Sequence, residues 1–205
     1  MALLSKPKII EWLDKSLSER LVITPILDPE EQIADGAVDL RLGTTFVLTQ
    51  KAEFPVMDPT REKDKLREEI HKYQVRVNKR FHEQFTLHPN ELVLGVTLEY
   101  MSFPSSLGGY VLSRSSWGRL GLIIATATFV NPGFSGCLTL ELLNLGEVPL
   151  ALYPGMRVAQ LVLHTVEEDV NNPSRHRSRY HGATEPEFSR VYEDPELQFW
   201  GRDHL

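Results

Sequence analysis

The stretch that decides the fold is GCLTLELLN, residues 136–144. Successive side chains of a β-strand point to opposite faces. Leu138 and the two leucines that follow at alternate positions therefore share one face, and Thr139 and Glu141 share the other. Antiparallel sheets commonly pack one apolar face on a core and leave the other face to solvent. We therefore expect this stretch to form a strand of an antiparallel sheet.

Other short β-prone segments lie on both sides of this strand. Pro132-Gly133 and Pro154-Gly155 mark turns between some of them. Short strands separated by turns, with helical patterns only at the margins, are typical of an antiparallel sandwich or barrel. The other segments expected to form strands are residues 22–25, 37–43, 44–48, 85–99, 111–113, 121–128, 148–152 and 157–164.

The remaining segments depart from the strand pattern. Apolar residues recur at helical spacing from Ile9 to Leu17, after Ser5 and Pro7, which are typical of a helix start, so we expect a short N-terminal helix. Two further segments also depart from the strand pattern.

The second segment, residues 51–84, is rich in Lys, Arg and Glu, while Leu66 and Ile70 keep a helical stripe. It predicts a charged, partly helical insertion at the surface. The third, residues 168–205, predicts a flexible tail that orders on a ligand or a neighbour. The length favours a single domain over residues 1–205.

The composition excludes several classes of protein. The chain has 205 residues, 41% hydrophobic and 24% charged, unlike a disordered protein. Its net charge of −6 lacks the basic excess of proteins that bind nucleic acid polymers, although local arginines can still bind one triphosphate. No apolar run approaches the ~20 residues of a membrane span. The single cysteine, Cys137, fits a reducing cytoplasm. We expect a cytoplasmic protein that contacts neither membranes nor nucleic acid polymers.

Glu141 is the first candidate for chemistry. A carboxylate in the middle of an apolar strand is costly unless it is paired or needed. Partial burial would raise its pKa toward neutrality and suit it to act as a general base. If its face of the strand lies in solvent, Glu141 is an ordinary surface residue, and the pattern alone leaves both interpretations open.

A second candidate is SRSSWGR, residues 113–119, which follows a predicted strand. Its two arginines, three serines and glycine can offer guanidinium, hydroxyl and backbone donors to phosphate oxygens. The alternative is a polar loop whose arginines are simply solvated.

Metal-binding motifs are missing from the sequence. The seven histidines and one cysteine form no His-x-Glu, no Cys-x-x-Cys and no histidine pair at helical spacing beside an acid. Zinc nucleobase deaminases need such a cluster, so deamination by this chain would proceed without zinc. The P-loop and Rossmann glycine motifs are also missing.

Taken together, these motifs resemble the core signature of the dCTP deaminase and dUTPase superfamily, and of the dCTP deaminase family within it. The core segments are RSSWGRLGL (114–122), TA (126–127), NPGFSG (131–136) and LTLE (138–141). The resemblance extends to VDLRLG (38–43), LHPNE (87–91), PGMR (154–157) and YHG (180–182). It covers most of the chain outside residues 51–84.

The resemblance implies an all-β fold, a distorted antiparallel β-barrel of the dUTPase type. It implies a homotrimer with each active site at a subunit interface. The partner would be a dCTP- or dUTP-type deoxynucleotide, with Mg²⁺ carried on its triphosphate and no metal held by the protein alone.

The resemblance also assigns catalytic roles. Glu141 would be the general base that takes a proton from water, and the Ser115 hydroxyl and the backbone carbonyl of Ala127 would hold that water. The water would attack C4 of cytosine, and the proton would pass to the departing ammonia. Arg119 would lie beside Glu141 and the base. The residues assigned to nucleotide binding are Arg114, Ser116, Asn131, Thr139, Arg179 and Tyr180.

Several positions depart from the family pattern. Asn131 stands where Asp is usual, and an amide can bond a hydroxyl but cannot act as an anionic base, which counts against diphosphate hydrolysis. Residues 123–127 are one residue short and lack a His before the Thr-Ala step. In the tail, Arg179 replaces a usual Lys and Ala183 a usual Gln.

Three functional hypotheses follow. The first is zinc-independent deamination of dCTP to dUTP and ammonia. The second is dUTP diphosphatase activity, alone or added to deamination. The third is a deoxynucleotide-binding regulator that keeps the fold but not turnover.

Overall fold

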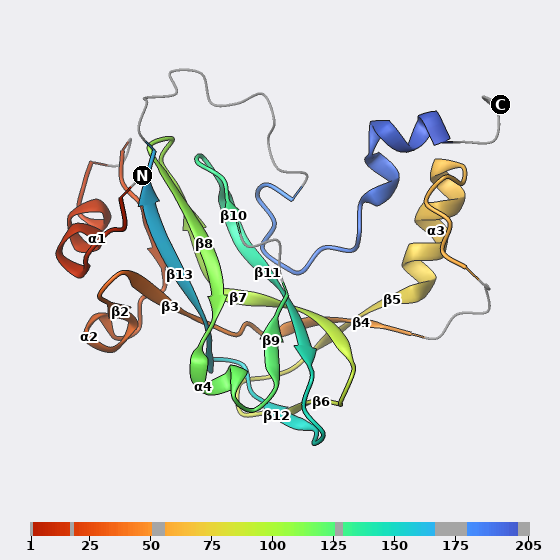
Figure 1. Ribbon diagram of the computed structural model, residues 1–205, viewed down its shortest axis with the longest axis horizontal. Helices are drawn as coiled ribbons and strands as arrows, with labels where there is room; N and C mark the ends of the chain where they lie inside the picture. The colour runs from red at the N-terminus through yellow and green to blue at the C-terminus, as the bar shows by residue number, and fades with distance from the viewer. Residues whose placement is uncertain (1, 17–18, 51–55, 126–128, 167–179, 201–205) are drawn as a thin grey trace.

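The computed structural model describes residues 2–16, 19–50, 56–125, 129–166 and 180–200. Antiparallel strands dominate this part of the chain and form three sheets (Figure 1). The largest sheet has the order β5-β4-β7-β11-β9, with β1 also paired to β7. Its strands are β1 (Val22–Thr24), β4 (Thr45–Thr49), β5 (Gln74–Asn78), β7 (Leu92–Ser102), β9 (Leu122–Ile124) and β11 (Ser135–Asn144).

The second sheet has the order β10-β8-β13-β3-β2, and the third is a pair of short strands. The second sheet contains β2 (Ile33–Ala34), β3 (Ala37–Arg41), β8 (Leu107–Ser113), β10 (Phe129–Val130) and β13 (Arg157–Thr165). The third pairs β6 (Phe85–Leu87) with β12 (Leu150–Leu152).

Helices are few and lie at the margins of the sheets (Figure 1). They are α1 (Lys6–Leu13), α2 (Pro29–Gln32), α3 (Lys63–Tyr73), α4 (Ser115–Gly118) and the 3-10 helices η1 (Val191–Glu193) and η2 (Pro195–Trp200). None of the helices in the described ranges is long and apolar enough to cross a membrane.

The structure therefore confirms the expected, mostly β fold, but it does not confirm every expected element. The strand pairings of the described residues leave the sheets unclosed, so the barrel itself stays a prediction. Residues 121–128 were expected to form one strand, but β9 ends at Ile124, and 126–128 lie outside the described residues. The charged insertion contains the expected helix, yet its residues 74–78 also form β5, which extends the main sheet.

The N-terminal helix is shorter than its apolar pattern predicts. Helix α1 ends at Leu13, and Leu17 lies outside the described residues. Ser5 occupies the cap position, but its side chain makes no capping hydrogen bond. Ile9 is fully buried, so this residue anchors the helix to the body of the protein.

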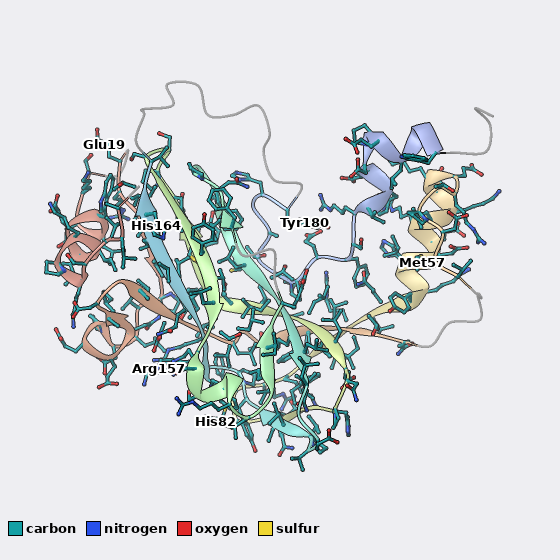
Figure 2. The ribbon with its side chains drawn as sticks, viewed as in Figure 1. Glu19, Met57, His82, Arg157, His164 and Tyr180 are labelled. Carbon is teal, nitrogen blue, oxygen red and sulfur yellow. The ribbon has the colours of Figure 1, made fainter. Side chains whose placement is uncertain are left out.

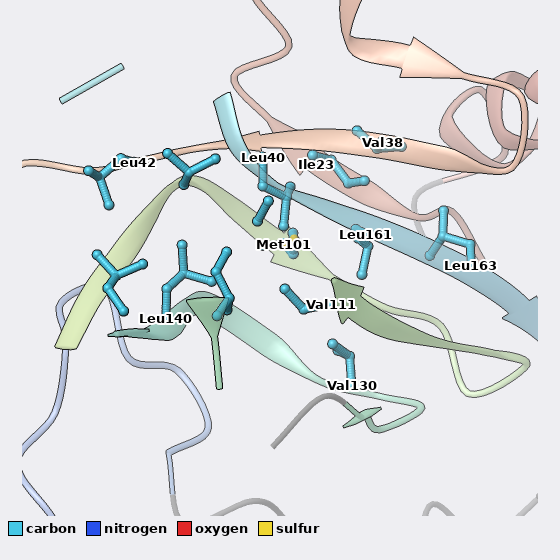
Figure 3. Packing of buried hydrophobic residues seen from close by; sticks show 14 of the residues in the cluster. Ile23, Val38, Leu40, Leu42, Met101, Val111, Val130, Leu140, Leu161 and Leu163 are labelled. Atoms are coloured by element: carbon cyan, nitrogen blue, oxygen red, sulfur yellow. The ribbon is translucent and has the colours of Figure 1, made fainter. Parts of the chain in front are cut away.

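The core lies between the two larger sheets (Figure 3). Met101 and Leu140 from the first sheet and Leu40 and Leu161 from the second are all fully buried in one hydrophobic cluster. Burying a side chain of this size contributes roughly 1.5–3 kcal/mol. The alternating leucines of β11 thus provide the apolar face that its sequence pattern requires.

A buried polar network crosses this core. Glu99 of β7 is fully buried, and its carboxylate accepts hydrogen bonds from Gln32 Nε2 and from the backbone N–H of Arg41, both at 2.9 Å. Gln32 Nε2 also donates to the carbonyl of Asp39 at 3.0 Å. The carboxylate therefore joins the first sheet to α2 and β3. Burial raises the pKa of Glu99 to about 7, against the opposing effect of these hydrogen bonds.

This raised pKa makes stability depend on pH. As pH rises from 4.5 to about 7, the unfolded chain loses the Glu99 proton before the folded chain does, so folding stability falls. A shift of this size corresponds to a loss on the order of 1–3 kcal/mol. Urea unfolding at about pH 5 and about pH 8 measures it.

Glu99→Gln provides the comparison. Its amide places an N–H against Gln32 or Arg41, so we expect lower stability at every pH. The carboxyl titration is gone, so the loss between the two pH values should shrink relative to the unsubstituted chain. An equal pH dependence in both proteins would contradict the assignment.

Candidate nucleotide site

Four of the predicted site residues meet in one pocket. Thr139 and Glu141 of β11, Asn131 after β10 and Tyr180 of the C-terminal segment line a cavity of about 540 Å³. The other lining residues are Gln74, Leu92, Leu94, Phe129, Val130, Phe134, Cys137, Leu138, Glu187 and Ser189. The mixture of apolar walls and a few polar groups is typical of a small-molecule site.

A β-bulge shapes the floor of this pocket. The pairing of β11 with β7 shifts register between Cys137 and Thr139. Thr97 Oγ1 accepts the Leu138 N–H at 2.9 Å and donates to the Glu99 carbonyl at 2.8 Å. Three residues of β7, 97–99, lie opposite one residue of β11, Leu138, so the extra residues belong to β7. Leu138 is half-buried: it packs against the core cluster and also lines the pocket.

Glu141 has the surroundings expected of a general base. It lies between the buried Leu140 and Leu142, opposite Leu94 of β7, and is itself half-buried. Burial raises the pKa of Glu141 above that of an ordinary carboxyl. Since Glu141 lines a pocket, the interpretation as an ordinary solvent-facing surface residue is not supported.

Asn131 stands where β10 turns back toward β11. Its carbonyl accepts the backbone N–H of Phe134 at 3.1 Å, and Gly133 has a φ of 75° in the same turn. The expected Pro-Gly turn is thus present. It holds the amide of Asn131 at the wall of the pocket, where it can bond a hydroxyl.

The C-terminal segment is held over β11 by backbone contacts. The carbonyl of Ala183 accepts the Cys137 N–H at 2.7 Å, and the Gly182 N–H donates to Ser135 at 2.7 Å. Gly136 has a φ of 140°, and a Cβ there would lie 2.8 Å from the Ala183 carbonyl. Glycine is therefore required for the segment to approach. This contact brings Tyr180 into the pocket wall.

The arginine-serine segment lies elsewhere. Ser115 and Ser116 open the single turn α4, Arg114 precedes it and Arg119 follows it, and none of these four lines the pocket. The Arg157 carbonyl accepts from Arg114 Nη1 at 3.3 Å, which places the two residues together. Arg157 and Tyr180 lie on opposite sides of the sheets in Figure 2. The predicted site residues in the described part of one chain therefore form two separate groups, which we call half-sites.

A buried aspartate organises the second half-site. Asp39 is 4% exposed, and its Oδ2 lies 3.3 Å from Arg114 Nη2 and 3.4 Å from Arg157 Nη1. Its Oδ1 accepts from Gln160 Nε2 at 3.1 Å. Arg157 also pairs with Glu31, whose Oε2 lies 3.4 Å from Arg157 Nη2. Two carboxylates thus orient two guanidinium groups beside the α4 serines. Such a cluster suits phosphate oxygens.

Asp39, Arg157 and Gln160 were not predicted as site residues. Asp39 had the same signal as Glu141, an acid in an apolar strand, and could have been found by that argument. Its partners could not, because β13 lies far from β3 in the sequence.

Two predicted site residues, Ala127 and Arg179, lie outside the described residues. Among the residues that are described, no group of three or more His, Cys, Asp or Glu side chains could hold a metal ion. Zinc-independent chemistry stays a prediction.

One solved structure has a similar fold. The structure resembles the crystal structure of 2′-deoxycytidine 5′-triphosphate deaminase from Agrobacterium tumefaciens, with a TM-score of 0.58 and 21% identity. The match covers 80% of this chain and 48% of that one. At this identity the likeness shows the fold alone.

The sequence comparisons define the family. A family model described as dCTP deaminase-like matches residues 3–166. The dUMP-forming dCTP deaminase of Methanobrevibacter smithii is 41% identical over 202 residues, 97% of this chain and all of its own length. The dCTP deaminase of Natronomonas pharaonis is 40% identical over 86% of this chain and 90% of its own. This chain belongs to the dCTP deaminase family, which confirms the expected resemblance and the prediction of an enzyme.

Proposed function

We propose that this chain deaminates dCTP hydrolytically at C4 of cytosine, with Glu141 as the general base. The observation that carries the proposal is the position of Glu141, half-buried in a pocket beside Thr139 and Asn131. A carboxyl whose pKa is raised toward neutrality can accept a proton from water and return it later in the reaction.

The proposed reaction has two steps. Water attacks C4 while Glu141 accepts its proton, which gives a tetrahedral intermediate. Glu141 then returns the proton to the amino group, the C4–N bond breaks, and ammonia leaves a uracil ring. By the family resemblance, Ser115 and the Ala127 carbonyl hold the water and Arg119 lies beside the base.

We further propose that each active site is shared between copies of the chain in a homotrimer. Ser115 and Arg119 do not line the pocket of their own chain, so a neighbouring copy has to supply them. Leu112, Leu120 and Phe129, close to these residues in the sequence, are 48%, 59% and 47% exposed. Exposed apolar side chains of this kind are typical of a protein interface.

The triphosphate would be held at the Asp39 cluster. Arg114 and Arg157 provide guanidinium donors there, and Ser115 and Ser116 provide hydroxyl donors. By the family resemblance, a Mg²⁺ ion would arrive with the nucleotide, because Mg²⁺ commonly takes substrate phosphates as ligands. The ion would neutralise phosphate charge.

The proposed final product is dUMP, with ammonia and diphosphate released from dCTP and two waters. The relative from Methanobrevibacter smithii, which aligns over its whole length, has a name that specifies dUMP formation. This replaces dUTP as the favoured product. The second candidate, release of dUTP, is favoured by Asn131, which lacks the carboxylate that would activate water at the phosphate end.

The base role predicts the effect of Glu141→Gln. The amide cannot accept a proton, so ammonia release from dCTP should fall by about 10²–10⁴-fold or more. Nucleotide binding, measured by calorimetry, should change little. Glu147→Gln, an exposed carboxyl beyond the end of β11, is the matched control and should keep full activity. Normal turnover in Glu141→Gln would remove Glu141 from the mechanism.

The identity of the product is tested by chromatography. Purified protein incubated with dCTP, and separately with dUTP, is expected to yield dUMP and diphosphate on an ion-exchange column. Accumulation of dUTP from dCTP, with dUTP left intact in the second incubation, would favour the second candidate.

The shared site predicts complementation between two inactive variants. Ser115→Ala and Glu141→Gln each damage one half-site, so each protein alone should be nearly inactive. Trimers mixed by joint refolding contain some sites in which an intact Glu141 faces an intact Ser115, and activity should return. Mixtures that stay as inactive as their components would exclude a site shared in this way.

A further inference from the structure

A second cavity lies outside the proposed nucleotide site, between α3 and the C-terminal segment. Its volume is about 470 Å³. In Figure 1, α3 stands beside the helical end of the C-terminal segment, at the edge of the first sheet that β5 forms. We call this cavity the α3 groove, defined by Lys63, Arg67, Arg76, Glu187, Phe188 and Arg190, which line it with neighbouring residues. The proposed reaction uses none of these groups.

Positive charge gathers in the α3 groove. Lys63 and Arg67 lie one helical turn apart and face it, and Arg76 and Arg190 line it from β5 and the C-terminal segment. Arg190 pairs with Glu187 at 2.7 Å, and Arg76 pairs with Glu185 at 2.9 Å.

Within the described part of the chain, by contrast, Lys63 and Arg67 have no ion pair. Glu193 also lines the groove and acts on Arg190. Four cations therefore face two lining carboxylates, Glu187 and Glu193, and the excess charge of the groove is positive in a chain of net charge −6.

The C-terminal segment completes this groove by docking on the sheet and helix. The ring of Phe188 packs edge-on against His71, with centroids 4.9 Å apart, and the Arg76 guanidinium lies 5.5 Å from its centre. The groove exists only while the segment is docked. Docking also brings Arg190 toward the α3 cations, and like charges oppose it.

We infer that the α3 groove binds a phosphate-bearing anion, a di- or triphosphate group, at a site distinct from the nucleotide pocket. A multivalent anion contacts Lys63 and Arg67 on one wall and Arg76 and Arg190 on the other. Its phosphate oxygens accept charge-assisted hydrogen bonds from both walls, and its negative charge offsets the repulsion between the cations of the two walls.

The groove is coupled to the nucleotide pocket through one short stretch of chain. Glu187 lines both cavities. The Ser189 N–H donates to Gln74 Oε1 at 2.9 Å, and the Arg190 N–H donates to the Tyr180 hydroxyl at 3.2 Å; Gln74, Ser189 and Tyr180 all line the nucleotide pocket. An anion that binds only the docked segment stabilises this wall. Nucleotide and anion therefore increase each other's affinity.

The test measures binding of inorganic triphosphate to the full chain by calorimetry at fixed ionic strength. Lys63→Glu with Arg67→Glu should weaken binding at the groove about tenfold or more. The matched control is Lys65→Glu with Lys72→Glu, which reverses two charges on the opposite face of α3 and should leave binding unchanged. Circular dichroism checks that both variants are folded. Equal affinities in the two double variants would overturn the site.

Two further arms separate this site from the nucleotide pocket. In Glu141→Gln protein saturated with dCTP, triphosphate should still bind, and more tightly than without dCTP; a lack of binding would mean that the phosphates share the nucleotide site and would overturn the inference. Failure of dCTP itself to bind would count against the proposed function instead.

Replacing triphosphate by dATP shows the source of the anion. Equal affinity means that the phosphates alone are recognised, and tighter binding means that a nucleotide base adds contacts, both of which support the groove.

Discussion

The structure depends on one buried carboxylate that joins its two large sheets. Glu99 comes from β7, in the middle of the first sheet, while the groups that bond it come from α2 and β3 beside the second. A buried acid without these donors would cost several kcal/mol. The facing sheets must therefore keep the spacing and register that place Gln32 and Arg41 against the Glu99 carboxylate. Apolar packing alone does not impose this spacing and register.

Hydrogen bonds connect both half-sites to this carboxylate. On one side, Gln32 bonds the backbone of Asp39, whose own carboxylate gathers Arg114 and Arg157. On the other side, the Glu99 carbonyl accepts from Thr97, which supports the bulge beneath Thr139 and Glu141. The Asp39 cluster and Glu141 are thus both connected by hydrogen bonds to one carboxylate in the core, although they lie in different half-sites.

Local patterns in the sequence predicted what is local in the structure. The alternation in β11 predicted both its buried face and the position of Glu141, and Pro-Gly pairs predicted the turns. The bulge in β7 opposite Leu138 was not predictable, because it depends on a contact between strands, the hydrogen bond from the Leu138 N–H to Thr97. The sequence pattern did not predict strand β5, because its neighbours are charged and exposed edge residues such as Arg76 interrupt the apolar alternation. The Asp39 cluster needed the pairing of β3 with β13.

Gly136 has a consequence for how this protein can vary. The C-terminal segment is fixed over β11 by main-chain groups and by the space that a missing Cβ leaves, so its position owes nothing to the identity of the Ala183 side chain. A segment held here by main-chain groups can exchange the side chain at position 183 and still return to the same place. Substitutions can thus change the side chains of this segment one at a time, while Gly136 keeps the backbone of the segment in place.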